Sequence, residues 1–486
     1  MLHKPLTSWQ YLQKMSERKQ KRLQNEKLRQ MMRLFPLASY YHSLFDVHKI
    51  PFKHIKQTKD LGIAQIPFTT KQDIVTTMEH PEKAAAFVLD PKKNLRLLPK
   101  LTTLKLFFSK KLKEELTEEF KPIHVHFTTG RSAMSIPVLY TKYDLENLRE
   151  AGKRMMSLLK IPNDVRVINV FPFAPHLAFW QTVYATNENN IFGLHTGGGR
   201  SMGSEKILQT MERMKAEAII GMPSYVYHLL SIAQEKHIDL HSVRYVLLGG
   251  EAVPPGYRQK IKELLCLNGA PADVKIYTTY GFTEGKIAWT QCHEESGYHL
   301  YPDMEYIEII DAEGNPVADG ESGEIVYTSL DFRGTAFLRY KTGDIGSLQT
   351  GPCPYCGAKT PRINPAITRS SDILSIQHTK IKGMFVDMNA VAAVLSSNQF
   401  IVDWQIVLEK KDKYDLDEVV LSVALHENAD KNHAKEEILR EFVSYFHVTP
   451  KIVLVSKEEL RKRLEMETAL KEKRIVDNRN IEKKRK

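Results

Sequence analysis

The stretch Ile276-Tyr-Thr-Thr-Tyr-Gly-Phe-Thr-Glu284 predicts a β-strand that ends in a sharp turn. Its first residues continue an apolar strand pattern, and Gly281 permits a tight bend or a close backbone approach. Just beyond the bend, Thr283 offers a hydroxyl and Glu284 a carboxylate. These oxygens suit a phosphate–Mg²⁺ site, because Mg²⁺ takes few protein oxygens and shares its other positions with phosphates and water. A surface turn that carries a glutamate would show the same residues.

The region before this turn alternates strands and helices. Val165–Phe171, Ala218–Ile220 and Tyr245–Leu248 predict apolar strands, and Ser204–Lys215 and Tyr225–Glu235 predict helices between them. Such repetition indicates a parallel sheet, whose ligands bind at the carboxyl ends of the strands. We therefore expect an α/β fold with a large N-terminal domain of mostly parallel sheets.

Several loops follow these strands or resemble phosphate-binding loops. Gly249-Gly-Glu-Ala-Val253 and the Tyr280–Glu284 turn should lie at the ligand-binding edge, whereas His195–Gly199 fits a mobile turn as well as a ligand contact. Residues 123–141 predict strand, loop and strand, and the loop hydroxyls and glycine of Thr128–Ser135 could hold a phosphate through backbone N–H groups. The glycine–lysine pattern of a Walker loop is absent.

Beyond residue 300 the pattern changes to short strands. Tyr306–Ile310 and Gly323–Thr328 predict a hairpin-rich β subdomain. Asp344 follows a glycine turn, where its carboxylate could accept two hydroxyl hydrogen bonds from a ribose or simply belong to a β-turn. After a predicted linker over 365–383, a small α+β domain is expected from helices at 386–395 and 435–446 and strands at 404–408, 419–425 and 451–455.

Composition and charge limit the class of protein. The 486 residues, 42% hydrophobic and 26% charged, are typical of a soluble globular protein with two or three domains. No membrane-helix or signal-peptide pattern is seen, so we expect a cytoplasmic protein without a membrane span. Residues 1–33 hold nine basic and two acidic side chains, and 457–486 hold twelve and seven, so the net charge of +11 belongs to the two ends. A nucleic-acid partner is not expected, because a nucleic-acid-binding protein would more often carry a basic surface on its folded domains than at its two ends.

Helix signals are clear near the N-terminus. Residues 9–34 contain no Gly or Pro and predict one helix that stops before Pro36. Its apolar residues form only a loose stripe, so a docking or surface helix is expected rather than a coiled coil. A shorter helix is expected after Thr70, a good N-cap with Asp73 three residues on.

Seven motifs in order resemble the adenylate-forming superfamily, and most of all its phenylacetate–CoA ligase-like branch. Tyr280-Gly-Phe-Thr-Glu284 resembles the family's YGxTE motif, Tyr340-Lys-Thr-Gly-Asp344 its YRTGD motif, and Thr128–Ser135 its phosphate loop. The other matching segments are Ile66–Asp73, Pro223–Tyr225, Gly249–Glu251 and Lys471–Asp477. The resemblance implies an N-terminal adenylate-forming domain over 1–368 with a basic helical extension over 1–33, a hinge over 369–383, and a small mobile C-terminal domain over 384–486.

The resemblance also implies a reaction in two steps. A carboxylate attacks the α-phosphate of ATP, giving acyl-AMP and pyrophosphate, and a thiol, expected to be coenzyme A, then displaces AMP. The first step needs two anions aligned and the charge that develops on phosphate neutralised. The catalytic residues implied are Lys471, Glu284 as the Mg²⁺ ligand, and Thr283 on a phosphate oxygen. The cofactor-binding residues implied are Thr128, Thr129, Gly130 and Ser132 for phosphate, Gly249, Gly250, Glu251, Tyr280 and Gly281 around the nucleotide, Asp344 for ribose, and Arg369 at the start of the hinge.

The acid and the acceptor are the least determined features. The expected acyl pocket consists of Phe173, His176, Trp180, Pro223, Ser224 and Tyr225. Its aromatic and apolar character favours an aryl or fatty acid, although core packing would also explain these residues. The phosphopantetheine of an acidic carrier protein is the alternative acceptor, and a homodimer is left open. Met134 stands where the family has a lysine, which keeps open a non-catalytic relative that has lost adenylation.

Four cysteines are too few for a disulfide scaffold of this size. Cys353-Pro-Tyr-Cys356 has the spacing of a metal-binding pair. Together with Cys292 and His299 it makes a Cys₃His set, as in some phenylacetate–CoA ligase relatives, and such a set suits a closed structural Zn²⁺ site. Three buried thiols without a metal would show the same residues. Cys266 lies on a helical stretch and is expected in the core.

Overall fold

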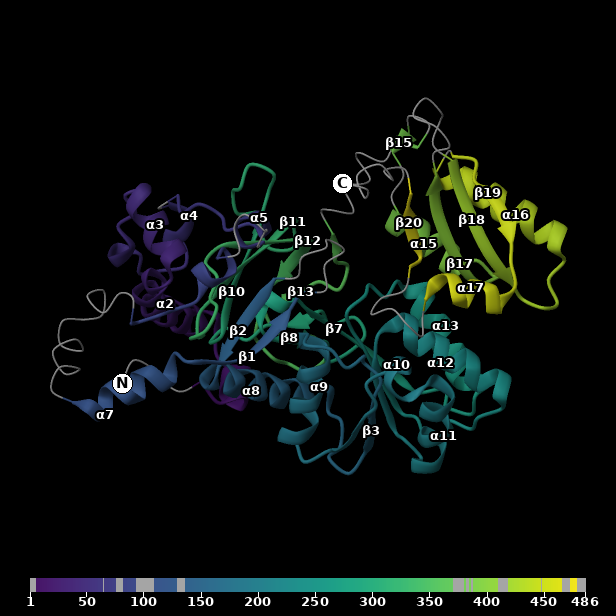
Figure 1. Cartoon of the computed structure of the whole chain (residues 1–486), viewed down its shortest axis with the longest axis horizontal. Helices are drawn as coiled ribbons and strands as arrows, with labels where there is room; N and C mark the ends of the chain where they lie inside the picture. Colours follow the sequence, from purple (N-terminus) through teal and green to yellow (C-terminus); the bar gives the residue numbers. More distant parts are fainter. Residues whose placement is uncertain are drawn as a thin grey trace.

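The computed structural model describes residues 6–63, 65–75, 82–92, 109–128, 136–369, 380–381, 384–385, 388–409, 418–446, 448–465 and 473–478. Its larger part holds two six-stranded sheets with helices around them, and a small domain with a four-stranded sheet follows (Figure 1). The predicted α/β fold class is confirmed. Among the described helices, none is long and apolar enough to span a lipid bilayer.

The central sheet has the strand order β4-β3-β5-β6-β7-β8. The first five strands run parallel to their neighbours, and β8 pairs antiparallel with β7. This confirms the parallel sheet predicted from the alternating strands and helices. The strands are β3 (Arg166–Asn169), β4 (Phe192–His195), β5 (Ala218–Gly221), β6 (Tyr245–Leu248), β7 (Lys275–Gly281) and β8 (Ala288–Thr290). The helices around them are α8 (Lys142–Leu159), α9 (Leu177–Glu188), α10 (Gly199–Met202), α11 (Ser204–Met214), α12 (Pro223–Lys236) and α13 (Pro255–Leu267).

Both faces of this sheet are buried. Ile168 and Val246 pack in one core cluster with residues of α11, α12 and α13. Val167 and Leu247 belong to a second cluster that includes residues of α8 and α9. Burial on two faces explains why these strands appear in the sequence as continuous apolar runs rather than as alternating patterns.

The β subdomain contributes the second six-stranded sheet. Its order is β10-β11-β12-β13-β9, and β14 also pairs with β12. The predicted hairpin strands at 306–310 and 323–328 are found as β10 and β11. The strands are β9 (Tyr298–His299), β10 (Glu305–Ile310), β11 (Ser322–Ser329), β12 (Tyr340–Gln349), β13 (Arg362–Ile363) and β14 (Thr368–Arg369). A separate hairpin, β1 (Pro122–Phe127) with β2 (Pro137–Thr141), matches the strands predicted over 123–141.

The single N-terminal helix predicted over 9–34 is wrong, because the structure divides it. Helix α1 (Trp9–Leu12) ends before an irregular segment, and α2 (Glu17–Leu34) begins after Ser16, whose backbone is extended. The break exposes the carbonyl of Gln13, which accepts a hydrogen bond of 2.7 Å from the amide of Lys359. A tertiary contact therefore replaces helix hydrogen bonds, which local propensity cannot anticipate.

The N-terminal helices are packed onto the larger domain. Lys27 is buried and its Nζ lies 2.8 Å from Asp331 Oδ2. Arg154 of α8 is also buried and pairs with Asp303 at 2.6 Å. The other N-terminal elements are η1 (Phe35–Leu37), α3 (Ser39–Val47), η2 (Phe52–His54), α4 (Asp60–Ile63), α5 (Lys71–Ile74) with the predicted Thr70–Asp73 capping box, η3 (Ala84–Phe87) and α7 (Lys110–Glu119).

The C-terminal region forms the predicted α+β arrangement, with the strand order β19-β18-β17-β20. A short hairpin, β15 (Lys380–Ile381) with β16 (Met384–Phe385), precedes it. The remaining elements are α15 (Met388–Ser397), β17 (Ile401–Glu409), β18 (Glu418–Leu425), α16 (Lys431–Phe446), β19 (Lys451–Leu454), α17 (Lys457–Leu464) and β20 (Ile475–Asp477).

This small domain sits against α12 and α13 of the larger one (Figure 1). The hydroxyl of Tyr227 donates to the carbonyl of Val402 at 2.8 Å. Lys260 Nζ donates to the carbonyl of Ile401 at 3.0 Å, and burial lowers the pKa of this lysine to about 8. Both of these contacts are hydrogen bonds from a side chain of the larger domain to the backbone of the smaller one.

Candidate functional site

The turn that follows β7 carries the first candidate carboxylate. β7 ends at Gly281, where a Cβ would lie 2.9 Å from the Cβ of Ala288. The next residues form a 3₁₀ turn, η5 (Thr283–Gly285), which buries Glu284 to 7% exposure. The hydroxyl of Tyr340 donates to Glu284 Oε1 at 2.7 Å. Among the residues that the structure describes, no lysine, arginine or histidine forms an ion pair with this buried carboxylate.

The second candidate carboxylate, Asp344, lies on β12 and is 3% exposed. The hydroxyl of Tyr280, from β7, donates to its Oδ2 at 2.7 Å. Across the ladder Asp344 pairs with Arg369 of β14, so the backbone at the start of the expected hinge lies beside this carboxylate. Strands β7 and β12 belong to different sheets, and the site forms where the two meet.

A buried ion pair lies beside the turn that carries Glu284. Lys286, just beyond η5, donates to Asp144 Oδ2 at 2.7 Å, and both side chains are almost fully buried. Asp144 also accepts hydrogen bonds from the amides of Thr141, Arg333 and Gly334. Burial lowers the pKa of Lys286, and the charge of Asp144 opposes that shift. This pair was not predicted, because Asp144 and Lys286 lie far apart in the chain and share no local pattern.

Two of the segments that resemble family motifs meet at the ends of β5 and β6. Glu251 Oε2 accepts a hydrogen bond of 3.1 Å from the amide of Ser224, at the start of α12. Tyr225 is buried and its hydroxyl lies 2.9 Å from Ser204 Oγ. Gly250 has a φ of +84°, which favours glycine, and a Cβ on Gly249 would lie 2.3 Å from Thr279 Oγ1. The structure thus joins the segments 223–225 and 249–251 beside the end of β7.

The expected acyl-pocket aromatics lie at the start of α9. Phe173 is 64% exposed, His176 is buried as the helix N-cap, and the rings of Phe173 and Trp180 are 6.5 Å apart. Trp180 also contacts His124, whose Nε2 lies 2.9 Å from that of His126. Burial lowers the pKa of His126 to about 3, so this ring is neutral. This histidine pair was not predicted. The two residues are separated by one position on β1, which places both side chains on the same face of the strand.

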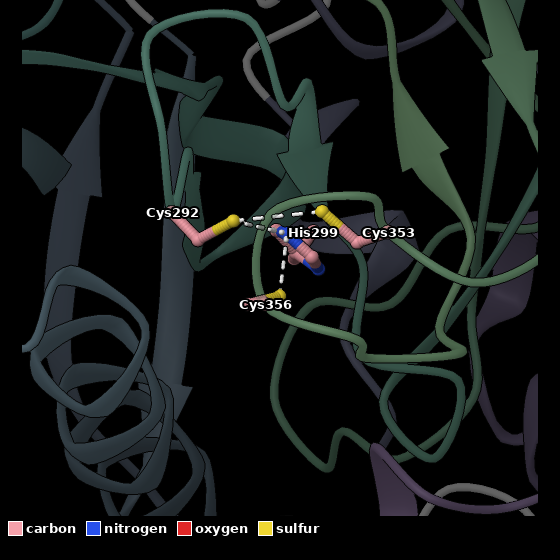
Figure 2. A group of neighbouring side chains, drawn as sticks. All are labelled: Cys292, His299, Cys353 and Cys356. Atoms are coloured by element: carbon pink, nitrogen blue, oxygen red, sulfur yellow. Dashed lines mark hydrogen bonds between the residues drawn. The ribbon is translucent and has the colours of Figure 1, made fainter.

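The Cys₃His set is brought together in one place. The candidate donor atoms of Cys292, His299, Cys353 and Cys356 all lie within 4.8 Å of one another (Figure 2). Cys292 Sγ is 3.6 Å from Cys353 Sγ and 3.3 Å from His299 Nε2, which in turn is 3.7 Å from Cys356 Sγ. Thiolates bound to one zinc ion at about 2.3 Å would lie about 3.7 Å apart in a tetrahedron, so the residues fit this metal.

Several predicted residues fall outside the described part of the chain. These are Thr129, Gly130 and Ser132 of the phosphate loop, the catalytic lysine Lys471, and nearly all of the hinge, where Arg369 is described by its backbone alone. Thr128 is described, and its Oγ1 accepts a hydrogen bond of 3.0 Å from the amide of Ile136, across the loop. The expectation that Cys266 lies in the core is wrong, because its helix turns this thiol to the surface.

Comparison with known proteins identifies the family. The family model described as "AMP-binding enzyme" matches residues 77–331, more than half of the chain. The chain belongs to the AMP-binding enzyme family. A phenylacetate-coenzyme A ligase of Thermus thermophilus is 24% identical to this AMP-binding enzyme over 453 residues, covering 90% of this chain and 88% of that protein. The corresponding ligase of Aromatoleum evansii is 25% identical over 317 residues, covering 59% and 67%.

The solved structures agree with the fold of this AMP-binding enzyme. 2-Hydroxyisobutyryl-CoA ligase, in the postadenylation state with R3-HIB-AMP, matches with a TM-score of 0.75 at 20% identity, over 99% of this chain and 95% of that one. At that identity the likeness establishes the fold. The resemblance to the phenylacetate–CoA ligase-like branch of the adenylate-forming superfamily, predicted from seven motifs, is confirmed.

Proposed function

We propose that this AMP-binding enzyme is an AMP-forming acid–thiol ligase. It activates an aryl or fatty acid with ATP as acyl-AMP and passes the acyl group to coenzyme A. The observation that carries the proposal is the pair of buried carboxylates, Glu284 and Asp344, held where the parallel sheet meets the β subdomain. The relatives support it, since they are named as phenylacetate-coenzyme A and 2-hydroxyisobutyryl-CoA ligases.

Each part of the site has a distinct task in acyl-AMP formation. Glu284 would hold Mg²⁺, which when bound neutralises negative charge on the phosphates. Asp344 would accept hydrogen bonds from the ribose hydroxyls, and the loop 249–251 would line the adenine. Thr283 and the loop 128–132 would bind phosphate oxygens, and Lys471 would reach the carboxylate and the α-phosphate. Alignment of the two anions is the main contribution of the protein.

The acid is expected to enter along the aromatic side chains at the start of α9. Phe173 and Trp180 offer ring surfaces, and Tyr225 closes the neighbouring loop. An aryl or alkyl group would bind to these ring surfaces more tightly than an amino acid, because the burial of apolar area contributes favourably to the binding free energy. The substrate class proposed is therefore an aryl or fatty carboxylic acid.

Isotopic exchange between pyrophosphate and ATP tests this function. The purified protein is incubated with Mg²⁺ and a panel of aryl and fatty acids, and each active acid is then offered coenzyme A or a phosphopantetheinyl carrier protein. We expect acid-dependent exchange and a coenzyme A thioester. Exchange with no acid in the panel would favour a relative that has lost adenylation, and acylation of the carrier alone would reassign the acceptor.

We also propose that residues 384–486 form a mobile domain on a hinge over 369–383, and that Glu235 helps to hold it in the observed position together with Tyr227 and Lys260. This carboxylate accepts hydrogen bonds from Lys457 at 2.5 Å and from Arg461 at 2.9 Å, both on α17. Burial alone would raise the pKa of Glu235, but the bonds from Arg461 and Lys457 hold it below its ordinary value. Because the pKa of Glu235 is lowered when the domain is docked, its ionised form stabilises the docked position at pH values above its ordinary pKa. This stabilisation is lost as the pH falls through the lowered pKa. Acid should therefore release the domain.

Glu235→Lys is therefore expected to release the small domain at neutral pH, because it places three cations together. Small-angle X-ray scattering should show a larger radius of gyration than for the wild type. Glu205→Lys is the matched control, since Glu205 pairs with Lys236 of the larger domain at 3.0 Å and not with α17. Equal radii for Glu235→Lys and the wild type would contradict the role of Glu235.

For the Cys₃His cluster we propose a structural Zn²⁺ ion. The proposal rests on geometry and donor chemistry, because three thiols and one imidazole, the donor types of structural zinc sites, lie within 4.8 Å of one another. Four protein ligands fill a tetrahedral site and leave no open position for a substrate. The cluster would fasten β9 to the loop that carries Cys353 and Cys356.

Cys353→Ser is expected to lose the zinc and to lower the melting temperature by several degrees, because one ligand of a closed site is removed. Elemental analysis should find about one zinc per wild-type chain and less than about half in the variant. Cys266→Ser, on the exposed thiol, is the control and should keep both its zinc and its stability. A wild-type protein purified without chelators that holds no zinc would reject the site.

A further inference from the structure

The two carboxylates of the site are held by tyrosines in a reciprocal arrangement. Strand β7 supplies Tyr280, and the turn after it supplies Glu284; β12 supplies both Tyr340 and Asp344. In each case the carboxylate follows its tyrosine by four residues. The bonds nevertheless cross: Tyr280 serves Asp344, and Tyr340 serves Glu284, each at 2.7 Å.

Each tyrosine is fixed by packing that does not involve its hydroxyl. The ring of Tyr280 stacks on Trp289, with centroids 5.8 Å apart and planes at 28°. Tyr340 is 2% exposed and its ring packs against Phe337 at 5.1 Å. A rigid ring carries a rigid hydroxyl, so each carboxylate receives its hydrogen bond from a fixed direction.

A neutral donor suits a carboxylate that must bind something else. A lysine or arginine would neutralise the carboxylate and compete with an incoming cation, whereas a phenol orients it and leaves its charge in place. The hydrogen bond from Tyr340 uses Glu284 Oε1, and a carboxylate has a second oxygen for a metal. Because Glu284 and Asp344 are buried, water cannot readily replace a lost hydroxyl.

We propose that Tyr340 and Tyr280 are positioning residues with separate duties. Tyr340 aims Glu284 at the divalent cation of the bound nucleotide, and Tyr280 aims Asp344 at the ribose hydroxyls. The identity of these two ligands rests on the proposed function. Since the bonds cross between the motifs, each tyrosine hydroxyl acts on the ligand of the other motif's carboxylate.

Binding measurements with hydroxyl-deleted variants separate the two duties without relying on turnover. Calorimetry in the absence of divalent cations compares AMP with its deoxyribose analogue, and electron paramagnetic resonance measures Mn²⁺ binding to the complex with ATP. Tyr280→Phe should bind AMP roughly tenfold more weakly and lose its preference over the analogue, because a hydrogen bond to a charged group is lost. Tyr340→Phe should bind Mn²⁺ roughly tenfold more weakly and keep its affinity for AMP.

Two controls make the result specific. Tyr327→Phe removes another buried hydroxyl near the turn, one that donates to the carbonyl of Gly285 at 3.3 Å, and should change neither affinity. In a Glu284→Gln background, Tyr340→Phe should weaken Mn²⁺ binding by less than about twofold, because a positioning residue acts only through its partner. If Tyr340 had only a structural role, Tyr340→Phe would weaken Mn²⁺ binding in the Glu284→Gln background by the same factor as in the wild type.

The outcomes are distinguishable. The crossed pattern supports the proposal. Equal weakening of AMP and Mn²⁺ binding by both variants, or no change in either, would overturn it while leaving the proposed function in place. A wild-type protein that binds neither AMP nor Mn²⁺ with ATP would overturn the proposed function and this inference together.

Discussion

Glu284→Gln is expected to lower the rate of acyl-AMP formation by about a hundredfold or more, the size of effect seen when one preorganised electrostatic contact is removed from an active site. The reason is electrostatic. Glu284 is a buried carboxylate that accepts a hydrogen bond from Tyr340, and under the proposed function a divalent cation would balance its charge. Glutamine keeps the shape and removes that charge. Single-turnover formation of acyl-AMP, followed with an acid that is active in the exchange panel, measures the loss.

Raising Mg²⁺ should recover part of the lost rate, because the weaker site is then filled by mass action. The control is Glu313→Gln, in the exposed turn between β10 and β11, which should match the wild type. A Glu284→Gln enzyme with the wild-type rate and the wild-type Mg²⁺ requirement would remove this residue from the site.

Asp144→Ala is expected to destabilise the larger domain by about 3–5 kcal/mol, as is usual when one member of a buried ion pair is removed. Lys286 would remain buried at 1% exposure without its counter-charge. The amides of Arg333 and Gly334 would also lose an acceptor, at 2.7 Å and 2.8 Å in the wild type. Unfolding in urea, monitored by circular dichroism, gives the free-energy difference.

A matched surface variant, Asp164→Ala, should change the free energy of unfolding by less than about 0.5 kcal/mol, because this aspartate is exposed. Lys286→Met tests the same pair from the other side, and it should be milder than Asp144→Ala because it leaves fewer donors unpaired. If Asp144→Ala unfolds at the wild-type urea concentration, the pair does not support the turn that carries Glu284.

Local patterns were sufficient for much of the fold. The strand predicted at Tyr245–Leu248 coincides with β6, and the capping signal at Thr70 and Asp73 is present, although its helix has only four residues. Apolar runs and the residue types at the ends of elements predict these strands well, because both faces of the central sheet are buried and its strands are therefore strongly apolar. The four candidate zinc ligands also lie together, as the spacing of Cys353 and Cys356 and the resemblance to the family implied.

The remaining features depend on contacts between distant segments. At the break between α1 and α2 the carbonyl of Gln13 accepts a hydrogen bond from the amide of Lys359, and beside the turn Lys286 pairs with Asp144. Neither contact has a local signature. The crossed tyrosines did have one, since both motifs repeat a tyrosine followed by a carboxylate at the same spacing. The sequence does not show which carboxylate each hydroxyl contacts, because that depends on how the two sheets that contain β7 and β12 pack against each other.

The most direct test of acyl-AMP chemistry follows an oxygen atom. The acid is labelled with heavy oxygen in its carboxylate and incubated with the enzyme, ATP, Mg²⁺ and coenzyme A, and the nucleotide product is examined by mass spectrometry. The carboxylate oxygen that attacks the α-phosphate stays with the phosphate when the thiol displaces AMP, so we predict AMP that carries one heavy oxygen. Unlabelled AMP, or label in a released phosphate alongside ADP, would contradict the account.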